Sequence, residues 1–170
     1  MSQGDVYFGA QVQLLKDQEI LPDIAFGMYC RTASGTKVED VRFTDAPGYF
    51  FDVSIGKSHH FEAWPNSYLR WYGSVGFYVW QTYLDEYPQN DAMSYGVGLE
   101  LHIGRLGFVN SLRGYNGYMN NGDHPMVYRS ELQLSEGLAS LILGYEYGIR
   151  DYPFSCFRAG VRITGLNDVK

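Results

Sequence analysis

Hydrophobic and polar residues alternate with a period of two along most of the chain, and this period predicts β-strands that have one apolar face. In residues 94–103, for example, Val97 and Leu99 alternate with glycine, glutamate and histidine. Segment 106–118 is assigned as a strand on its composition, because its two faces are poorly resolved. The pattern predicts about nine strands, at 6–15, 24–33, 49–58, 69–79, 94–103, 106–118, 126–134, 139–150 and 155–163.

The predicted strands are roughly 9–14 residues long, whereas strands of globular proteins usually have about 5–6 residues. A strand that crosses a bilayer at a tilt needs about 9–11 residues. The connections alternate between short turns and longer loops, as in outer-membrane barrels, whose longer loops face the cell exterior. We therefore expect residues 1–170 to form one all-β domain, an antiparallel up-and-down, transmembrane-type β-barrel of about 8–10 strands. The predicted short connections are 58–67, 104–105 and 136–137, and the other set is 34–47, 84–92, 119–125 and 150–153.

The expected number of strands raises a question of parity. Bacterial barrels normally have an even number of strands and both termini on the periplasmic side. If the last of nine strands ends on the side of the short turns, the first strand must begin on the side of the long loops. We therefore expect the chain to be an N-terminally shortened or altered version of a longer barrel protein.

Alternation alone does not tell whether the apolar face of each strand points out of the barrel or into it. The residues on the other face of the strands distinguish these two orientations. These residues are mainly Gly, Ser, Tyr and Arg, whereas a water-facing surface is usually rich in Lys, Glu and Thr. We expect the apolar side chains to face lipid and the polar ones to line a lumen. Charges there should pair, because burying an unpaired charge costs several kcal/mol. The lumen residues expected to contact permeating solutes or ligands are Arg31, Arg70, Glu100, His102, Arg129, Glu131, Glu146, Arg150, Arg158 and Arg162.

The opposite orientation remains an alternative. In a soluble, lipocalin-like barrel that binds an apolar small molecule, the apolar residues point inward and the polar ones face water. The residues that would then line the cavity are Trp71, Phe77, Val97 and Leu141.

Composition narrows the classes of function. The chain has 13 basic and 19 acidic residues, a formal net charge of −6, which argues against nucleic acid as a partner. No apolar run approaches the roughly 20 residues of a transmembrane helix.

Cys30 and Cys156 fall on apolar faces of predicted strands and are expected to be free thiols. Aromatic residues cluster near strand ends, as in interfacial girdles. The clusters are Tyr49–Phe51, Tyr78 with Trp80 and Tyr83, and Tyr145 with Tyr147 and Tyr152.

A family resemblance rests on short strand and loop stretches: Phe43–Asp52, Gly76–Tyr83, Gln89–Ala92 and Asn120–Asp123, together with Pro22–Ala25 and Thr32–Gly35. These stretches resemble those of uncharacterised outer-membrane β-barrel proteins of the porin or transporter type. The resemblance extends from about Gly4 to Ile163. It implies a location in the bacterial outer membrane and no known catalytic residues.

The sequence predicts no enzyme. His59 and His60 are adjacent, so in a strand they would point in opposite directions and make a poor chelate. Neither a Gly-x-Ser-x-Gly elbow nor a phosphate-binding loop is present. We expect no catalytic residue, no metal and no cofactor. The expected function is a non-enzymatic membrane barrel, either a small pore or transport-related protein or a structural one, with lipid or detergent and small solutes as partners.

Overall fold

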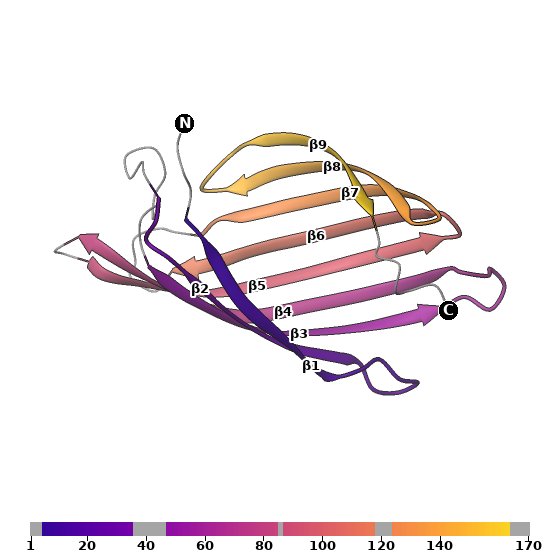
Figure 1. The fold of residues 1–170 in the computed structure, drawn as a ribbon, viewed down its shortest axis with the longest axis horizontal. Coiled ribbons are helices and arrows are strands. Elements are labelled where there is room, and N and C mark those ends of the chain that lie inside the picture. The colour runs from indigo at the N-terminus through magenta and orange to yellow at the C-terminus, as the bar shows by residue number, and fades with distance from the viewer. Residues whose placement is uncertain (1–4, 36–46, 85–86, 118–123, 164–170) are drawn as a thin grey trace. The chain divides into compact units, whose positions relative to one another are not determined.

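The computed structural model describes residues 5–35, 47–84, 87–117 and 124–163, apart from the side chains of residues 82–90. No helix in these residues is long and apolar enough to cross a membrane. The described backbone forms nine strands (Figure 1). They are β1 (Tyr7–Leu15), β2 (Asp23–Arg31), β3 (Gly48–His60), β4 (Tyr68–Leu84), β5 (Tyr87–Ile103), β6 (Leu106–Gly117), β7 (Met126–Glu136), β8 (Ala139–Arg150) and β9 (Ser155–Ile163).

The strands form a single sheet in which each strand pairs with its neighbours in the sequence, from β1 at one end of the order to β9 at the other. The ladders β1–β2, β6–β7, β7–β8 and β8–β9 are antiparallel. The predicted all-β, antiparallel, up-and-down arrangement is therefore confirmed. The strands also agree with the predicted segments, most closely for β1, β8 and β9.

The largest difference from the prediction concerns the connection at 84–92. We expected a loop there, but β4 continues to Leu84 and β5 begins at Tyr87. That prediction was wrong because it relied on local composition, whereas a ladder between two long neighbouring strands overrides local propensity. The expected loops at 34–47 and 119–125 lie largely outside the described residues.

Two predicted turns depend on glycine. Gly104 joins β5 to β6 with φ +59°, and Gly137 joins β7 to β8 with φ +57°. A Cβ atom at either position would meet no atom within 4 Å. The positive φ, rather than lack of space, therefore favours glycine here, as is usual in tight hairpin turns.

The chain divides into two compact units. Unit 1 consists of Met1–Ile55, Ser74–Tyr95 and Tyr115–His124, and it contains β1 and β2 with parts of β3, β4, β5 and β6. In the β1–β2 ladder, Tyr7 lies opposite Arg31. Opposite residues of a ladder share a face, so these side chains lie on what we call the polar face of unit 1.

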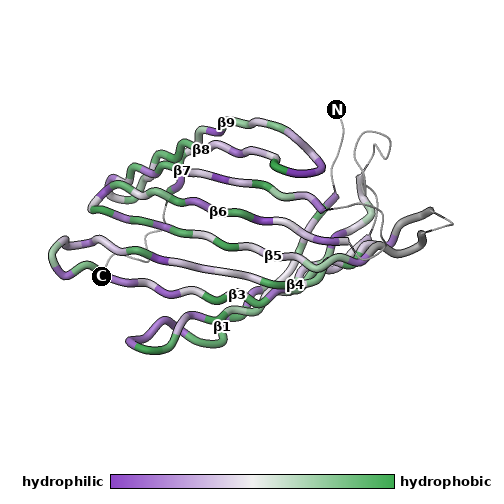
Figure 2. The backbone as a smooth tube through the Cα atoms, turned by 180° about the vertical axis from the view of Figure 1, so that it is seen from behind, coloured by the Kyte–Doolittle hydropathy of each residue, from purple (hydrophilic) through white to green (hydrophobic). Residues whose placement is uncertain are grey.

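Unit 2 consists of Gly56–Gly73, Gly96–Gly114 and Pro125–Lys170, and it contains β7, β8 and β9 with parts of β3 to β6. Its strands alternate between hydrophobic and hydrophilic residues (Figure 2). We call the face with Leu132 and Leu143 the apolar face of unit 2, and the opposite face its polar face. The single domain expected over residues 1–170 stays a prediction.

Candidate functional site on the polar faces

Large apolar side chains are exposed, whereas the polar residues next to them in sequence are partly shielded. Leu99 and Leu143 are 47% and 48% exposed. The side chains of the neighbouring Glu100 and Glu146 are only 23% and 22% exposed. Among the described residues, the buried hydrophobic ones are Trp80 and Ala92. This distribution is the reverse of a water-soluble protein, which buries its large apolar side chains.

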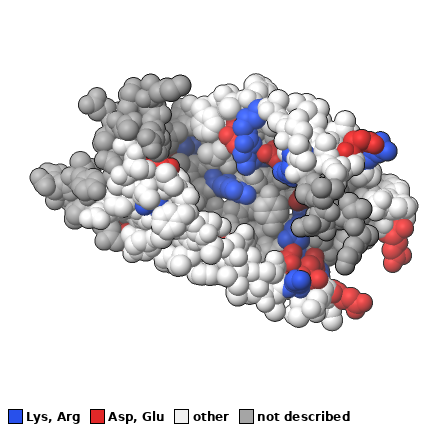
Figure 3. Space-filling view, viewed as in Figure 1, with Lys and Arg blue, Asp and Glu red and all other residues white. Residues whose placement is uncertain are grey.

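Four charged side chains from β7, β8 and β9 meet on the polar face of unit 2. Arg129 Nε lies 2.7 Å from Glu146 Oε1 and 3.6 Å from Glu131 Oε1. Arg158 Nη2 lies 3.0 Å from Glu131 Oε1 and 3.3 Å from Glu146 Oε1. Two positive and two negative charges therefore neutralise one another. Basic and acidic atoms are accordingly intermingled over these strands (Figure 3).

A glycine creates the space for this four-charge cluster. Gly144 lies opposite Glu131 on β7 and opposite Arg158 on β9. A Cβ atom at this glycine would lie 3.4 Å from Arg158 Nη2. The small residue thus lets the guanidinium reach across β8 to the carboxylate of Glu131.

A second polar cluster joins β4 to β5 in unit 2. The Tyr68 hydroxyl donates a hydrogen bond to Glu100 Oε1 at 2.7 Å, and His102 Nε2 lies 3.0 Å from the same oxygen. The Tyr68 and His102 rings stack with centroids 4.8 Å apart. The sequence predicted that Glu100 and His102 share a face, but it missed Tyr68. In residues 68–78 the polar residues occupy even-numbered positions, and this alternation could have placed Tyr68 on the polar face.

Arg70 lies on the polar face beside another glycine. Its Nη1 atom donates to Ser58 Oγ at 3.0 Å. A Cβ atom at Gly56 would lie 2.7 Å from Arg70 Nη2. The guanidinium therefore lies against the backbone of β3, and a larger residue at position 56 would displace it.

Arg31 belongs to unit 1 and pairs with a residue that the sequence did not single out. Its Nε atom donates to Asp5 Oδ2 at 2.7 Å. Asp5 also accepts hydrogen bonds from the backbone amides of Ser34, at 3.1 Å, and Gly35, at 2.7 Å. Burial raises the pKa of Asp5, but these hydrogen bonds and the charge of Arg31 together lower it below the ordinary value.

Two of the predicted lumen residues lie apart from these clusters. Arg162 is opposite Ser140 in the β8–β9 ladder, and Arg150 is opposite Met126, next to an irregularity in the β7–β8 ladder. Both side chains belong to exposed residues. Neither forms an ion pair with another described residue.

The sequence-based assignment of Cys156 to the apolar side and part of the expected aromatic girdle were wrong. Cys156 lies opposite Glu146, so it lies on the polar face; both cysteines are free thiols. Phe50, Tyr78 and Trp80 pack against one another on the polar face of unit 1 and do not form a girdle. The reason is that consecutive residues of a strand point to opposite faces, so a local cluster of aromatic residues is divided between them. The side chain of Tyr83 lies outside the described part of the chain.

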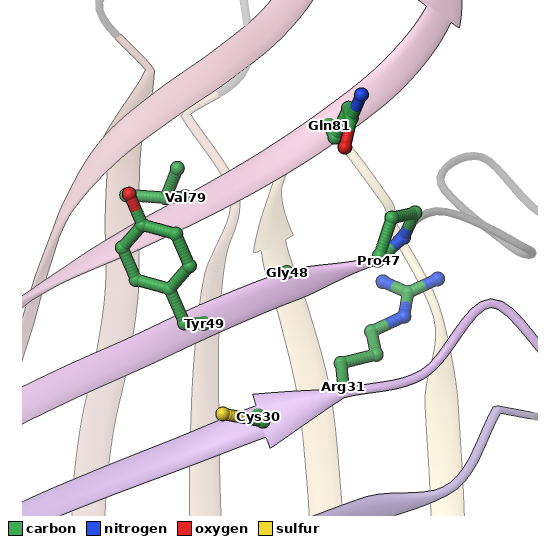
Figure 4. A pocket seen from close by; sticks show the side chains of 7 residues that line it. All are labelled: Cys30, Arg31, Pro47, Gly48, Tyr49, Val79 and Gln81. Atoms are coloured by element: carbon green, nitrogen blue, oxygen red, sulfur yellow. The ribbon is translucent and has the colours of Figure 1, made fainter.

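Two cavities lie among the described residues of unit 1. One, of about 420 Å³, lies where β2 ends and β3 begins, and there Arg31 extends toward Pro47 (Figure 4). Its other lining residues are Cys30, Gly48, Tyr49, Val79 and Gln81. The second cavity, of about 360 Å³, is lined by Tyr7, Tyr29, Arg31, Phe50, Asp52, Tyr78 and Trp80.

The described residues contain no group of three or more His, Cys, Asp or Glu side chains that could hold a metal ion. No protein-family model matches the sequence, and a comparison with curated proteins finds no match.

Proposed function

We propose that this chain is a non-enzymatic outer-membrane β-barrel protein. In this proposal its apolar face meets lipid, and its polar face surrounds a narrow lumen. The observation that carries the proposal is the exposure of large apolar side chains on every strand, combined on β3 to β8 with the partial or full shielding of glycines and charges such as Gly56, Glu100 and Glu146 on the opposite face. Contiguous apolar surface of this kind is a binding surface for lipid or protein rather than for water.

The polar clusters support a narrow lumen rather than a wide diffusion pore. A barrel of about nine strands has room for little more than its own inward side chains. Paired charges such as Arg129 with Glu146, and Arg158 with Glu131, would occupy much of that space. We therefore propose that the lumen is filled or passes only small solutes, and that its charged side chains govern passage.

Detergent-free gel filtration and insertion into vesicles test this proposal. We expect the refolded chain to aggregate without detergent and to insert into phosphatidylcholine vesicles as a β-rich, protease-resistant species. A monodisperse monomer in plain buffer, with β structure and no uptake by vesicles, would contradict the proposal. That result would favour the soluble, lipocalin-like alternative.

A further inference from the structure

The second cavity of unit 1 has mainly aromatic walls, although it opens on the polar face. Tyr7 and Tyr29 come from β1 and β2, and Phe50, Tyr78 and Trp80 come from β3 and β4. Its volume of about 360 Å³ is within the range of small-molecule sites. All lining residues belong to unit 1, so the cavity is defined without any residue of unit 2.

The rings on the β3–β4 side stand nearly at right angles to one another. Phe50 and Tyr78 have centroids 4.8 Å apart and an interplanar angle of 84°. Phe50 and Trp80 are 6.1 Å apart, and Tyr78 and Trp80 are 5.4 Å apart, each pair at 73°. Rings turned in this way present their negative faces in several directions. A cation beside such rings is attracted by the ring quadrupoles.

The charge of the cavity points to the same kind of ligand. Arg31 lines the cavity, but its charge is balanced by Asp5, and the two side chains are only 8% and 4% exposed. Asp52 accepts a hydrogen bond from the Ser54 hydroxyl at 3.0 Å and forms no ion pair with a cationic side chain of the described residues. One negative charge therefore remains in the cavity.

A glycine keeps this carboxylate accessible. A Cβ atom at Gly27 would lie 3.1 Å from Asp52 Oδ2 and 3.2 Å from the Tyr29 hydroxyl oxygen. Any larger residue at position 27 would therefore crowd the carboxylate and the ring. Gly27 preserves the space in which a ligand could contact both.

We propose that this cavity binds a small organic cation of the alkylated ammonium class. The aromatic rings contact its methyl groups, and Asp52 balances its charge. An anionic ligand would meet the carboxylate, and a neutral apolar ligand would leave that charge without a partner. Of the three kinds of ligand, only the cation interacts favourably with both the aromatic rings and the carboxylate.

Calorimetric titration of the full-length protein tests this inference, in a polyoxyethylene detergent that carries neither a choline nor a sugar head group. The probes are choline and its uncharged isostere 3,3-dimethyl-1-butanol, with glucose as a sugar probe. We expect choline to bind saturably and at least about tenfold more tightly than the isostere, since only the charged probe gains the cation–π and carboxylate interactions. Comparable binding of the isostere, preferential binding of glucose, or no binding of choline would overturn the inference.

Two variants locate the site. Asp52→Asn should weaken choline binding about tenfold, because it removes the balancing charge. Glu136→Gln is the matched control, since this carboxylate is exposed at the end of β7 and pairs with Arg105. This variant should bind choline as the parent protein does. Equal affinities of the two variants would contradict the assignment to this cavity. If Asp52→Asn does not fold, the comparison of choline with its isostere still decides the question.

Discussion

Arg129 of β7 and Glu146 of β8 occupy opposite positions in the ladder, and their charged atoms lie 2.7 Å apart. The same carboxylate lies 3.3 Å from Arg158 of β9, so one glutamate connects three strands. Pairs of side chains that face each other across neighbouring strands, on one face of the sheet, stabilise the sheet. These ion pairs therefore help to hold β7, β8 and β9 together. In the proposed barrel the same charges would also line the lumen.

Glu146→Gln should destabilise the protein, because it leaves two partly shielded guanidinium groups with one carboxylate. We expect the free energy of unfolding to fall by about 1–3 kcal/mol, between the values for exposed and buried ion pairs. Guanidinium unfolding in micelles measures the change. The control is Glu136→Gln, whose side chain is 68% exposed, with an expected change of at most about 0.5 kcal/mol. Equal losses in the two variants would show that the cluster has no special role.

Val97→Arg distinguishes lipid from water around the apolar face. Val97 is 60% exposed, so an arginine there would change stability by no more than about 0.5 kcal/mol if the face were in water. If the position faces the middle of the bilayer, the loss should be about 2–4 kcal/mol. Equilibrium unfolding from lipid vesicles measures it, with Val97→Leu as the apolar control. An arginine variant as stable as this control would count against lipid at this position.

Gly98→Ala tests the close contact between β4 and β5. An added Cβ atom would overlap the Tyr72 ring, so we expect a loss of about 1–3 kcal/mol from overpacking. Gly160→Ala is the matched control, because nothing lies within 4 Å of that position. Truncating the ring with Tyr72→Leu should reduce the cost of Gly98→Ala. If alanine at positions 98 and 160 has the same effect, the overlap is not what requires glycine.

Acid should loosen the contact between Asp5 and Gly35. Because the pKa of Asp5 is lowered in the folded state, its carboxylate stabilises the fold above its unfolded pKa of about 3.9. That contribution is lost as the pH falls through the lower folded value. Hydrogen exchange of the Gly35 amide should show protection at neutral pH that decreases in strong acid. In Asp5→Asn the protection should be weaker at neutral pH and change less with acid; protection that is independent of pH in the parent protein would refute the role of this charge.

The strands were predictable because alternation is a property of local sequence, and the turns at Gly104 and Gly137 were predictable because glycine tolerates positive φ. The hairpin between β4 and β5 was not, since pairing between long strands outweighed the loop-forming composition of 84–92. The sequence also indicated that charges such as Glu100 and Arg129 share faces with other polar residues.

The partners of those charges depend on register, which the period of two leaves open. Asp5 was missed because it precedes β1, and its contact with Arg31 spans 26 positions in the sequence. The aromatic cavity was missed because its rings come from four strands. Asp52 is a single carboxylate in an otherwise aromatic stretch of sequence, so only the three-dimensional arrangement reveals its neighbours.

Quenching of tryptophan fluorescence by brominated lipid tests the orientation of the strands most directly. Trp71 is 40% exposed on the side of the apolar residues, whereas Trp80 is 5% exposed and lines the aromatic cavity. Two variants, each retaining one of these tryptophans, would be inserted into vesicles of brominated phosphatidylcholine. We predict strong quenching of Trp71 and weak quenching of Trp80. Strong quenching of Trp80 with none of Trp71, or no quenching of either, would contradict an apolar face turned toward lipid.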